Sequence, residues 1–236
     1  MKVHNIKNTQ FGDDRWFTLS TVPDHVYFEI GQSIKDIKQN PSVHKKANAN
    51  LAGHIDDEYE LNKIPLTEKF VMEEIMALEK DKNYGASSIA LLNRFFSKNE
   101  QVTAPSFTMD SSYWINFQQK HEYNPKHVHS GLYSWVIWYK IPYTKQDEVD
   151  KGPGEVSYPR HNVNGEFVFS TTDTMMPNMF VDTVVSVERD LEKKLIIFPS
   201  HTAHSVYPFY STNDERISIA GNVYISLLND FKNKLT

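Results

Sequence analysis

Short runs of apolar residues, separated by turn-forming residues, dominate the chain from about residue 106 to residue 225. Runs of this length, rich in Val, Ile, Tyr, Phe and Trp, are typical of β-strands. Several short strands joined by turns predict a sandwich or a barrel. We expect strands at residues 113–117, 134–141, 166–170, 183–187, 195–198 and 217–225.

One longer segment, residues 144–165, interrupts this series of strands. It contains Gly152, Pro153, Gly154 and Asn164, which are residue types that favour turns. We therefore interpret the segment as a long insertion or a hairpin excursion.

Helical spacing of apolar residues is found earlier in the chain. Thr67 can cap a helix that ends at residues 83–85. The apolar residues on one face of this helix are Phe70, Val71, Ile75 and Leu78. A second helix is expected from Ser87 or Ser88. Its apolar positions are Ile89, Leu92, Phe95 and Phe96.

The two halves of the chain therefore differ in character. Residues 26–30 are the best strand candidate near the N-terminus, before the break at Gly31, and residues 34–39 predict one or two helical turns. Helices with a single apolar stripe need one surface to cover, so we expect them to pack on the outside of a sheet. We predict a mixed N-terminal region at residues 1–104 and a β core at residues 105–236, together forming one compact unit.

Composition narrows the possible classes of protein. The 236 residues can bury a sizeable core, and 13% aromatic residues favour an ordered globular chain. A net charge of −5 gives little support for general binding to nucleic acid. The absence of cysteine excludes disulfides, thiolate catalysis and Cys-ligated zinc or iron–sulfur clusters. Histidine and carboxylate are then the plausible metal ligands.

Hydropathy indicates no membrane partner. Residues 1–14 are polar and lack the apolar segment of a signal peptide. No later stretch has the roughly eighteen consecutive apolar residues that span a bilayer. We expect a cytoplasmic protein.

The first candidate for chemistry is the pair His127 and His129, one residue apart. Side chains at positions i and i+2 of a strand point to the same face. Neutral imidazole is a common ligand of zinc, copper and iron, so such a pair predicts half of a metal site.

The other half is expected in residues 195–206, an apolar run that ends in proline and is followed by two histidines, His201 and His204. Either histidine can lie just beyond the strand end. If residues 208–214 close a hairpin, His204 falls opposite Arg216, which begins the next apolar run. Arg216 and Ser218 are in phase on that run, so both can contact one carboxylate.

These motifs resemble those of the 2-oxoglutarate- and Fe(II)-dependent oxygenases of bacteria and phages. The similarity extends from Trp114 to Tyr224, and Arg216 lies twelve positions after His204. It implies a double-stranded β-helix, a jelly-roll or cupin-like core with its site at one open end. It also implies that His204, not His201, is the distal ligand, and that the protein is a dioxygenase, usually a hydroxylase, using Fe(II), 2-oxoglutarate and molecular oxygen.

The resemblance further implies that His127, His129 and His204 are the metal ligands, and that Arg216 binds the distal carboxylate of 2-oxoglutarate. The residues expected to assist Arg216 in this binding are Ser218, Asn116 and Tyr139. The sequence itself does not identify the substrate. A small molecule and a peptide side chain are expected, and a nucleobase is the further alternative.

His129 departs from the family pattern, in which a carboxylate stands at this position. Glu122, Asp110 and Glu166 are alternative third ligands, although no motif supports them. A site with three histidines is chemically reasonable, because imidazole binds Fe(II) well and leaves open positions for other ligands.

Two other functions fit part of the pattern. A non-catalytic jelly-roll module, for binding or for phage structure, explains the strands but not the coincidence of two histidine motifs with a spaced Arg-x-Ser. A cupin-type enzyme with three histidines and no 2-oxoglutarate explains His127 and His129 but not Arg216.

Overall fold

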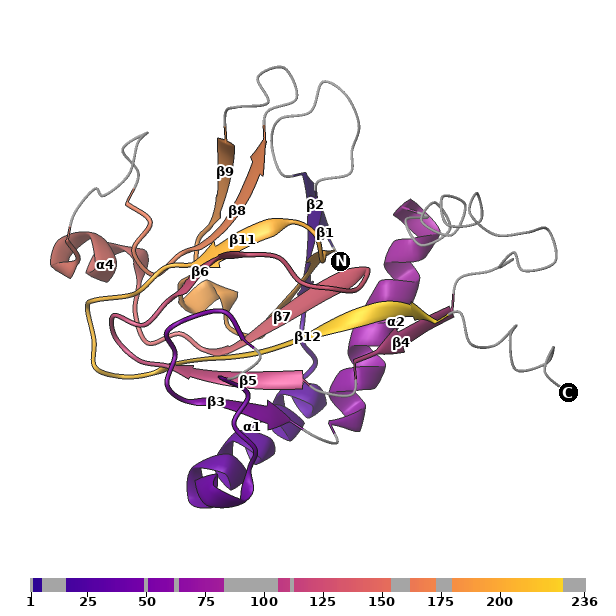
Figure 1. Ribbon diagram of the computed structural model, residues 1–236, viewed down its shortest axis with the longest axis horizontal. Coiled ribbons are helices and arrows are strands. Elements are labelled where there is room, and N and C mark those ends of the chain that lie inside the picture. The colour runs from indigo at the N-terminus through magenta and orange to yellow at the C-terminus, as the bar shows by residue number, and fades with distance from the viewer. Residues whose placement is uncertain are drawn as a thin grey trace, which may run out of the picture.

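The computed structural model describes residues 2–5, 16–48, 51–61, 64–82, 106–110, 113–153, 162–172 and 180–226. Within these residues the strands form two antiparallel sheets, of eight and four strands (Figure 1). The strands of the larger sheet are β1 (Lys2–Asn5), β2 (Trp16–Thr21), β3 (Glu58–Leu61), β4 (Ser106–Met109), β5 (Tyr113–Gln118), β7 (Tyr133–Lys140), β10 (Lys194–Pro199) and β12 (Arg216–Ser226). The strands of the smaller sheet are β6 (Asn124–His127), β8 (Phe167–Thr172), β9 (Phe180–Val185) and β11 (Ala203–Val206).

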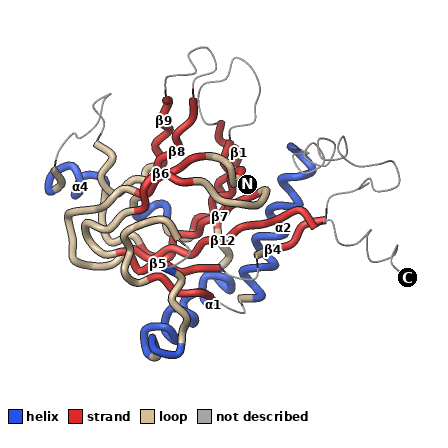
Figure 2. The backbone as a smooth tube through the Cα atoms, viewed as in Figure 1, coloured by secondary structure: helices blue, strands red, loops and turns tan. Residues whose placement is uncertain are grey.

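The order of strands is β1-β2-β10-β7-β12-β5-β3 in the larger sheet, with β4 paired to β12. The smaller sheet has the order β6-β11-β8-β9. The described helices are α1 (Asp24–Gln39), α2 (Pro65–Lys82) and α4 (Lys145–Lys151), with 3-10 turns at Pro41–Val43 and Arg189–Leu191. Figure 2 shows the strands in the middle of the molecule and α4 at its margin. The prediction of a mainly β jelly-roll core with N-terminal helices is confirmed.

The larger sheet has two different faces because side chains alternate along each strand. One face packs under α1 and α2, where Ile30 and Ile75 join an apolar core with Ile115, Ile137 and Ile219. Burying one such side chain contributes about 1.5–3 kcal/mol to stability. The other face looks toward the smaller sheet. It carries a second apolar cluster where β2, β7 and β10 lie, and polar side chains along β5 and β12.

All six predicted strands overlap strands of the structure. The predicted helix is α2, but it begins at Pro65, so Thr67 lies inside the helix and does not cap it. Phe70, Val71, Ile75 and Leu78 are buried on α2 as expected. The second predicted helix, at residues 87–96, lies outside the described residues.

The strand predicted at residues 26–30 is wrong, since these residues belong to α1. Val26, Ile30, Ile34 and Ile37 are buried, which is a helical stripe with spacings of three and four residues. The apolar run Val26–Ile30 is only the first part of that stripe. A short apolar run cannot by itself distinguish a strand from a buried helix.

The hairpin predicted across residues 208–214 is also wrong. β11 pairs with β6 and β8 in the smaller sheet, whereas β12 pairs with β5, β7 and β4 in the larger one. The connection therefore crosses from one sheet to the other, as jelly rolls require. His204 and Arg216 face each other across the space between the sheets rather than along one ladder.

The segment at residues 144–165 contains α4. Thr144 and Asp147 cap the N-terminus of this helix with reciprocal hydrogen bonds. Residues 154–161 of this segment are outside the described residues.

Strands from both sides of residue 105 pair in the larger sheet, since β2 pairs with β10 and β3 with β5. The division of the chain at that residue stays a prediction. Among the described helices, none combines the length and apolar character of a membrane span.

Candidate metal centre and adjoining cavity

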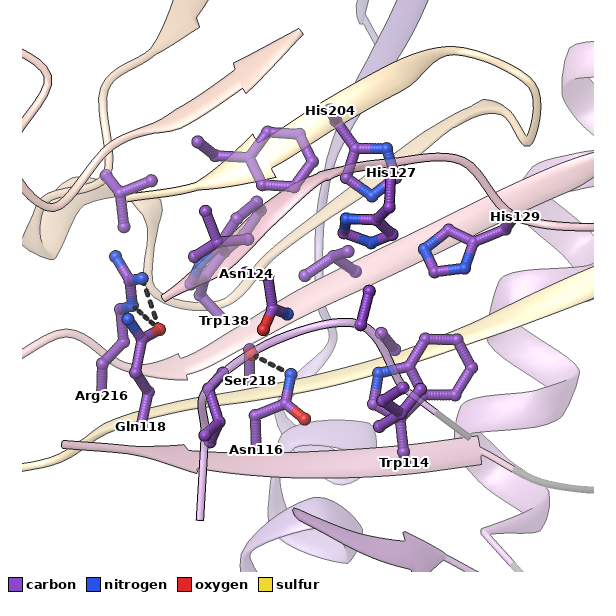
Figure 3. Close-up of a pocket in the computed structure, with 18 residues that line it drawn as sticks. Trp114, Asn116, Gln118, Asn124, His127, His129, Trp138, His204, Arg216 and Ser218 are labelled. Atoms are coloured by element: carbon purple, nitrogen blue, oxygen red, sulfur yellow. Dashed lines mark hydrogen bonds between the residues drawn. The ribbon is translucent and has the colours of Figure 1, made fainter. Parts of the chain in front are cut away.

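Three histidines from two separate parts of the chain meet at one end of the smaller sheet (Figure 3). His127 ends β6, and His204 on β11 is its direct cross-strand partner. His129 follows β6, and its backbone N–H donates to the Ser200 carbonyl at 3.0 Å. One ligand nitrogen of each ring lies within 4.8 Å of the others. A metal ion can therefore contact all three rings.

The loop that carries His129 turns back to the larger sheet at Gly131. Gly131 has φ of +101°, which side chains of L residues rarely allow. The next residue, Leu132, then donates its N–H to the Val223 carbonyl at 2.8 Å. The turn holds the end of the His-x-His segment against β12.

Hydrogen bonds fix the tautomers of two of the rings. His127 Nδ1 lies 2.7 Å from the Pro125 carbonyl, and His204 Nδ1 lies 2.9 Å from the Thr202 carbonyl. A carbonyl oxygen only accepts, so each Nδ1 carries the proton. Each Nε2 then keeps its lone pair for a metal, which is a common arrangement of ligating histidines.

The three rings are also held in the neutral form. Burial lowers the pKa of His127, and burial together with neighbouring His127 lowers the pKa of His129 to about 4. The pKa of His204 lies well below its usual value because of burial, then His127 and His129. Neutral imidazole is the form that binds a metal, so three neutral donors fit a divalent ion such as Fe(II).

Aromatic rings from both sheets surround the cluster. The Phe167 ring stacks on His204 at 5.2 Å between centroids, and the Phe198 ring meets it edge-on at 4.9 Å. Trp114 lies 5.6 Å from the His129 ring. These contacts limit the rotation of two of the imidazoles and shield them from water.

None of the three carboxylates considered as third ligand belongs to a possible metal cluster within the described residues. Glu166 pairs with Lys145, and Glu122 accepts the backbone N–H groups of Asp56 and Gln119. Asp110 lies near Tyr224, with 3.5 Å between the carboxylate and the hydroxyl. His201, the competing distal histidine, is exposed and lies outside the cluster.

A cavity between the sheets, here called the inner cavity, leads from the histidines to Arg216 (Figure 3). Its floor is formed by alternate residues of β5 and β12, and its space is about 50 Å³. The floor residues are Trp114, Asn116 and Gln118 of β5, and Arg216, Ser218 and Ala220 of β12. None of the residues lining it is acidic.

Arg216 is only 2% exposed and makes no ion pair within the described residues. Its Nε and Nη2 donate to the Gln118 side-chain oxygen at 3.1 and 2.5 Å. Nη1 donates to the Tyr143 hydroxyl and the Gly165 carbonyl, and Nη2 also donates to the Tyr207 carbonyl. Arg216 is thus a buried positive charge with neutral partners, and such a charge favours a nearby anion.

Two of the predicted partners of Arg216 line the same cavity. Asn116 Nδ2 lies 3.5 Å from the Ser218 hydroxyl, while Asn116 Oδ1 is buried with no hydrogen-bond partner. A buried polar atom without a partner is costly, so this oxygen marks a place where a ligand or water can donate.

Tyr139 requires a correction, because the structure places it on the opposite face of β7. Its ring stacks on Tyr27 of α1, with 4.5 Å between centroids, and it is not part of the cavity lining. Trp138, one residue earlier, does line the cavity. The reason is the alternation of side chains along a strand, by which adjacent residues point to opposite faces.

The sequence analysis missed Gln118 and Tyr143, which both contact Arg216. Gln118 is two residues from Asn116 on the same strand, so strand alternation could have placed it on the same face. Tyr143 follows β7 in an irregular segment, and no periodic signal marks it.

Comparisons with known proteins give a family match and similar solved structures. Residues 112–222 match a family described as "putative 2OG-Fe(II) oxygenase". A prolyl-4-hydroxylase from Pseudomonas putida superposes with a TM-score of 0.52 at 11% sequence identity, covering 89% of this chain and 92% of that chain. A prolyl hydroxylase from Trichoplax adhaerens gives a TM-score of 0.49 at 12% identity, covering 92% and 86%. No curated protein matches the sequence at a significant level.

Proposed function

Residues 112–222 are a domain of the 2OG-Fe(II) oxygenase family, and from this premise we propose that His127, His129 and His204 hold Fe(II) and that the inner cavity receives 2-oxoglutarate. Membership makes the protein a dioxygenase that requires Fe(II), 2-oxoglutarate and molecular oxygen. We propose which residues bind each of these, and that the protein hydroxylates a substrate.

One observation carries the assignment of the metal ligands. His127, His129 and His204 bring their ligand nitrogens within 4.8 Å of one another, in a site where burial keeps all three neutral. Three imidazoles on one side of an ion leave open positions on the other side. The same histidines line the inner cavity, so a ligand bound there would lie beside the metal they would hold.

Arg216 is the proposed anchor for the far carboxylate of 2-oxoglutarate. Its Nε and Nη2 form the edge of the guanidinium on which a carboxylate can bind with two hydrogen bonds. In the structure one oxygen of Gln118 accepts from both nitrogens. An entering carboxylate would replace this neutral acceptor with a charged one, while Tyr143 and Gly165 keep Nη1 in place.

Ser218 and Asn116 lie between Arg216 and the histidines along the floor of the cavity. They are proposed to hydrogen-bond the bound co-substrate and fix its orientation. The hydroxyl of Ser218 can donate to a carboxylate oxygen, and the Asn116 amide can donate or accept.

The chain also excludes water from the reacting centre. Val136, Trp138 and Phe167 form apolar walls of the inner cavity, and His204 itself is 2% exposed. When bound, the metal would supply the position at which 2-oxoglutarate is decarboxylated to succinate and oxygen is activated for substrate oxidation. The histidines would hold it in one orientation, and the walls would keep the oxidising reaction from solvent.

Hydroxylation of a small molecule or a peptide side chain is the proposed outcome. The Pseudomonas putida structure with this fold is a prolyl-4-hydroxylase, and its 11% identity supports the fold alone. The reaction class therefore rests on the family of residues 112–222.

Anaerobic titration of the full chain with Fe(II), with and without 2-oxoglutarate, tests the proposal. A weak visible charge-transfer band should form only when both are present, and oxygen should then release succinate even without substrate. His127→Ala and His204→Ala should each lose most of the bound Fe(II), measured by elemental analysis, while they stay folded.

The matched control is His201→Ala, which removes an exposed histidine near the same strand end. It should bind Fe(II) like the wild type. Wild-type metal content in His127→Ala or His204→Ala would remove that residue from the ligand set. A band and succinate release that are absent in the wild type would overturn the proposed function itself.

A further inference from the structure

The inner face of β12 continues past the metal centre into a second cavity. Alternate residues of this strand share one face, and Arg216, Ser218 and Ala220 line the inner cavity. The next two in phase, Asn222 and Tyr224, line a separate space of about 290 Å³, here called the outer cavity.

His129 and Trp114 line both cavities. The candidate metal centre therefore lies between a space that ends at Arg216 and a larger space on its other side. A substrate bound in the outer cavity would lie beside the metal ligands without occupying the position proposed for 2-oxoglutarate.

The two cavities have opposite charge. The lining of the inner cavity includes Arg216 and no carboxylate, whereas that of the outer cavity includes Asp110 and Glu60 and neither lysine nor arginine. Glu60 already pairs with Lys45 at 2.5 Å. Asp110 makes no ion pair within the described residues. Asp110 is thus the carboxylate available to a ligand.

Asp110 is held in place by its neighbours. Its backbone N–H donates to the Asn222 carbonyl at 2.9 Å, and the Tyr224 hydroxyl lies 3.5 Å from its carboxylate. The same hydroxyl lies 2.8 Å from the hydroxyl of Ser130, in the loop that follows His129. These contacts connect the carboxylate to both sides of the outer cavity and restrict its orientation.

A second polar group lines the outer cavity independently of the charge. Asn222 is 6% exposed, and its Oδ1 accepts a hydrogen bond from Ser134 at 2.8 Å. Its Nδ2 has no acceptor among the hydrogen bonds of the described residues. An amide donor that lines a cavity and has no acceptor in the protein favours a ligand that brings one, such as a carbonyl oxygen.

Aromatic rings complete the lining. Trp114 lies on the wall formed by β5, and Tyr224 on the wall formed by β12. Tyr113 also borders the cavity, but its ring belongs to the apolar core on the helix side, beside Trp135. Ring faces attract ammonium and guanidinium groups, and most strongly when those groups are shielded from water.

The geometry points to a cationic substrate: we propose that the outer cavity binds an ammonium- or guanidinium-bearing group against Asp110, with a carbonyl oxygen of the same molecule at Asn222. This inference rests on the proposed function, whose substrate class it names. Trp114, beside His129, pairs with Ala220, and Asp110 is bonded to the residue two positions further on β12. Two strand residues span about 7 Å, so the backbone positions beside His129 and beside Asp110 are close together on β12.

The test uses the full chain loaded with Mn(II) and 2-oxoglutarate, titrated calorimetrically with matched probes. Nα-acetyl-lysine methylamide and Nα-acetyl-norleucine methylamide share their carbonyls and alkyl chain and differ in the terminal ammonium. The lysine probe should bind about tenfold more tightly, as a partly buried charge pair allows. Free lysine, titrated in parallel, distinguishes a free amine from a side chain within a peptide.

Asp110→Asn should remove this preference by weakening the lysine probe alone about tenfold. The matched control is Asp150→Asn, which removes an exposed carboxylate on α4 and should keep the preference. Because the lysine and norleucine probes are first compared on the wild-type protein, the result does not depend on the folding of a variant.

Equal affinities for the two probes, no binding of either at millimolar concentration, or a preference that survives Asp110→Asn would each overturn the inference. In all three cases 2-oxoglutarate binding and succinate release would leave the proposed function standing. If the wild-type protein neither binds 2-oxoglutarate nor releases succinate, the proposed function fails, and the substrate assignment fails with it.

Discussion

Where β5, β7 and β12 form the larger sheet, both of its faces hold buried side chains, but the helix face is apolar and the other face carries the polar groups of the site. Under α1 and α2, Ile115, Trp135 and Ile219 are fully buried among apolar neighbours. On the other face of the same strands, Arg216 and Asn116 are 2% and 8% exposed. The strands therefore separate a hydrophobic core from a polar site by alternation alone. The two faces are not distinguished by how buried their side chains are. They are distinguished by the polar atoms of the site face and the hydrogen-bond partners of those atoms.

The two faces also differ in their effect on stability. Each large apolar side chain on the helix face contributes about 1.5–3 kcal/mol. On the site face, Glu58 Oε1 and Asn116 Oδ1 are buried without partners, and each such atom costs about 1–3 kcal/mol. The site is thus a local loss of stability that the helix face offsets. Substitutions on one face should unfold the protein, and those on the other should change binding.

The largest effect is expected on the helix face. Trp135→Ala removes a fully buried ring that touches Tyr113 and packs closely against Gly221, so the free energy of unfolding should fall by about 3–5 kcal/mol. Urea denaturation of the metal-free protein measures it. The control is Val136→Ala, one residue away on the site face, which should cost clearly less. Equal losses for the two variants would contradict the division into core and site.

The second largest effect is expected on the site face, in the binding of 2-oxoglutarate. Arg216→Ala should weaken binding of 2-oxoglutarate to the Mn(II)-loaded protein by about 2–5 kcal/mol and change Mn(II) affinity little. Arg216→Lys should restore only part, because an ammonium cannot present two parallel donors.

Calorimetric titration compares these variants with Arg189→Ala, which removes an arginine of the 3-10 turn Arg189–Leu191. The control should bind 2-oxoglutarate as the wild type does. If Arg216→Ala binds equally well, the co-substrate carboxylate is held elsewhere.

A smaller effect on Fe(II) binding tests whether His129 is the third metal ligand. His129→Ala should weaken Fe(II) binding by about ten- to a hundredfold, whereas His129→Asp offers a carboxylate in its place and should lose less. Aspartate is shorter than histidine, so release of succinate from 2-oxoglutarate should be partial. Succinate release by His129→Ala at the wild-type rate would show that His129 is not a ligand.

The sequence predicted the strands of the core well because their apolar runs are short and bounded by turns. It also predicted the histidine cluster, since His127 and His204 belong to motifs of fixed spacing. It failed at residues 26–30, where the local pattern suits a strand but the stripe continues to Ile37 on a helix. Local patterns cannot reveal how far a stripe extends when its first residues fit both periods.

The sequence also failed to predict which strands and side chains meet between the two sheets. Placing β12 beside β11 assumed that neighbours in sequence pair in space, whereas the chain crosses to the other sheet after residue 206. Tyr139 was misplaced although the alternation that puts Trp138 in the cavity was readable. Tyr143 and Gly165 reach Arg216 from an irregular segment, and only the folded chain brings them there.

The smallest expected effect concerns Glu58, a carboxylate on the site face that is 2% exposed. Burial, with nearby Glu122 as a further cause, raises the pKa of Glu58 to about 7. Because the folded pKa lies above the unfolded one, this group favours folding below the unfolded pKa and loses that contribution as pH rises through 7. Glu58→Gln should therefore raise the free energy of unfolding relative to the wild type by about 1–2 kcal/mol more at about pH 8 than at about pH 5.5. Comparing the variant with the wild type at each pH cancels the opposite contribution of the three histidines, whose contribution to the stability of the protein is lost as pH falls.

Glu60→Gln is the control, because Glu60 lies on the same face of β3 but is paired with Lys45, and it should give no such gain. If urea denaturation gives the same difference at both pH values for Glu58→Gln, the buried carboxylate has a partner that neutralises it, and the site face is less costly than argued.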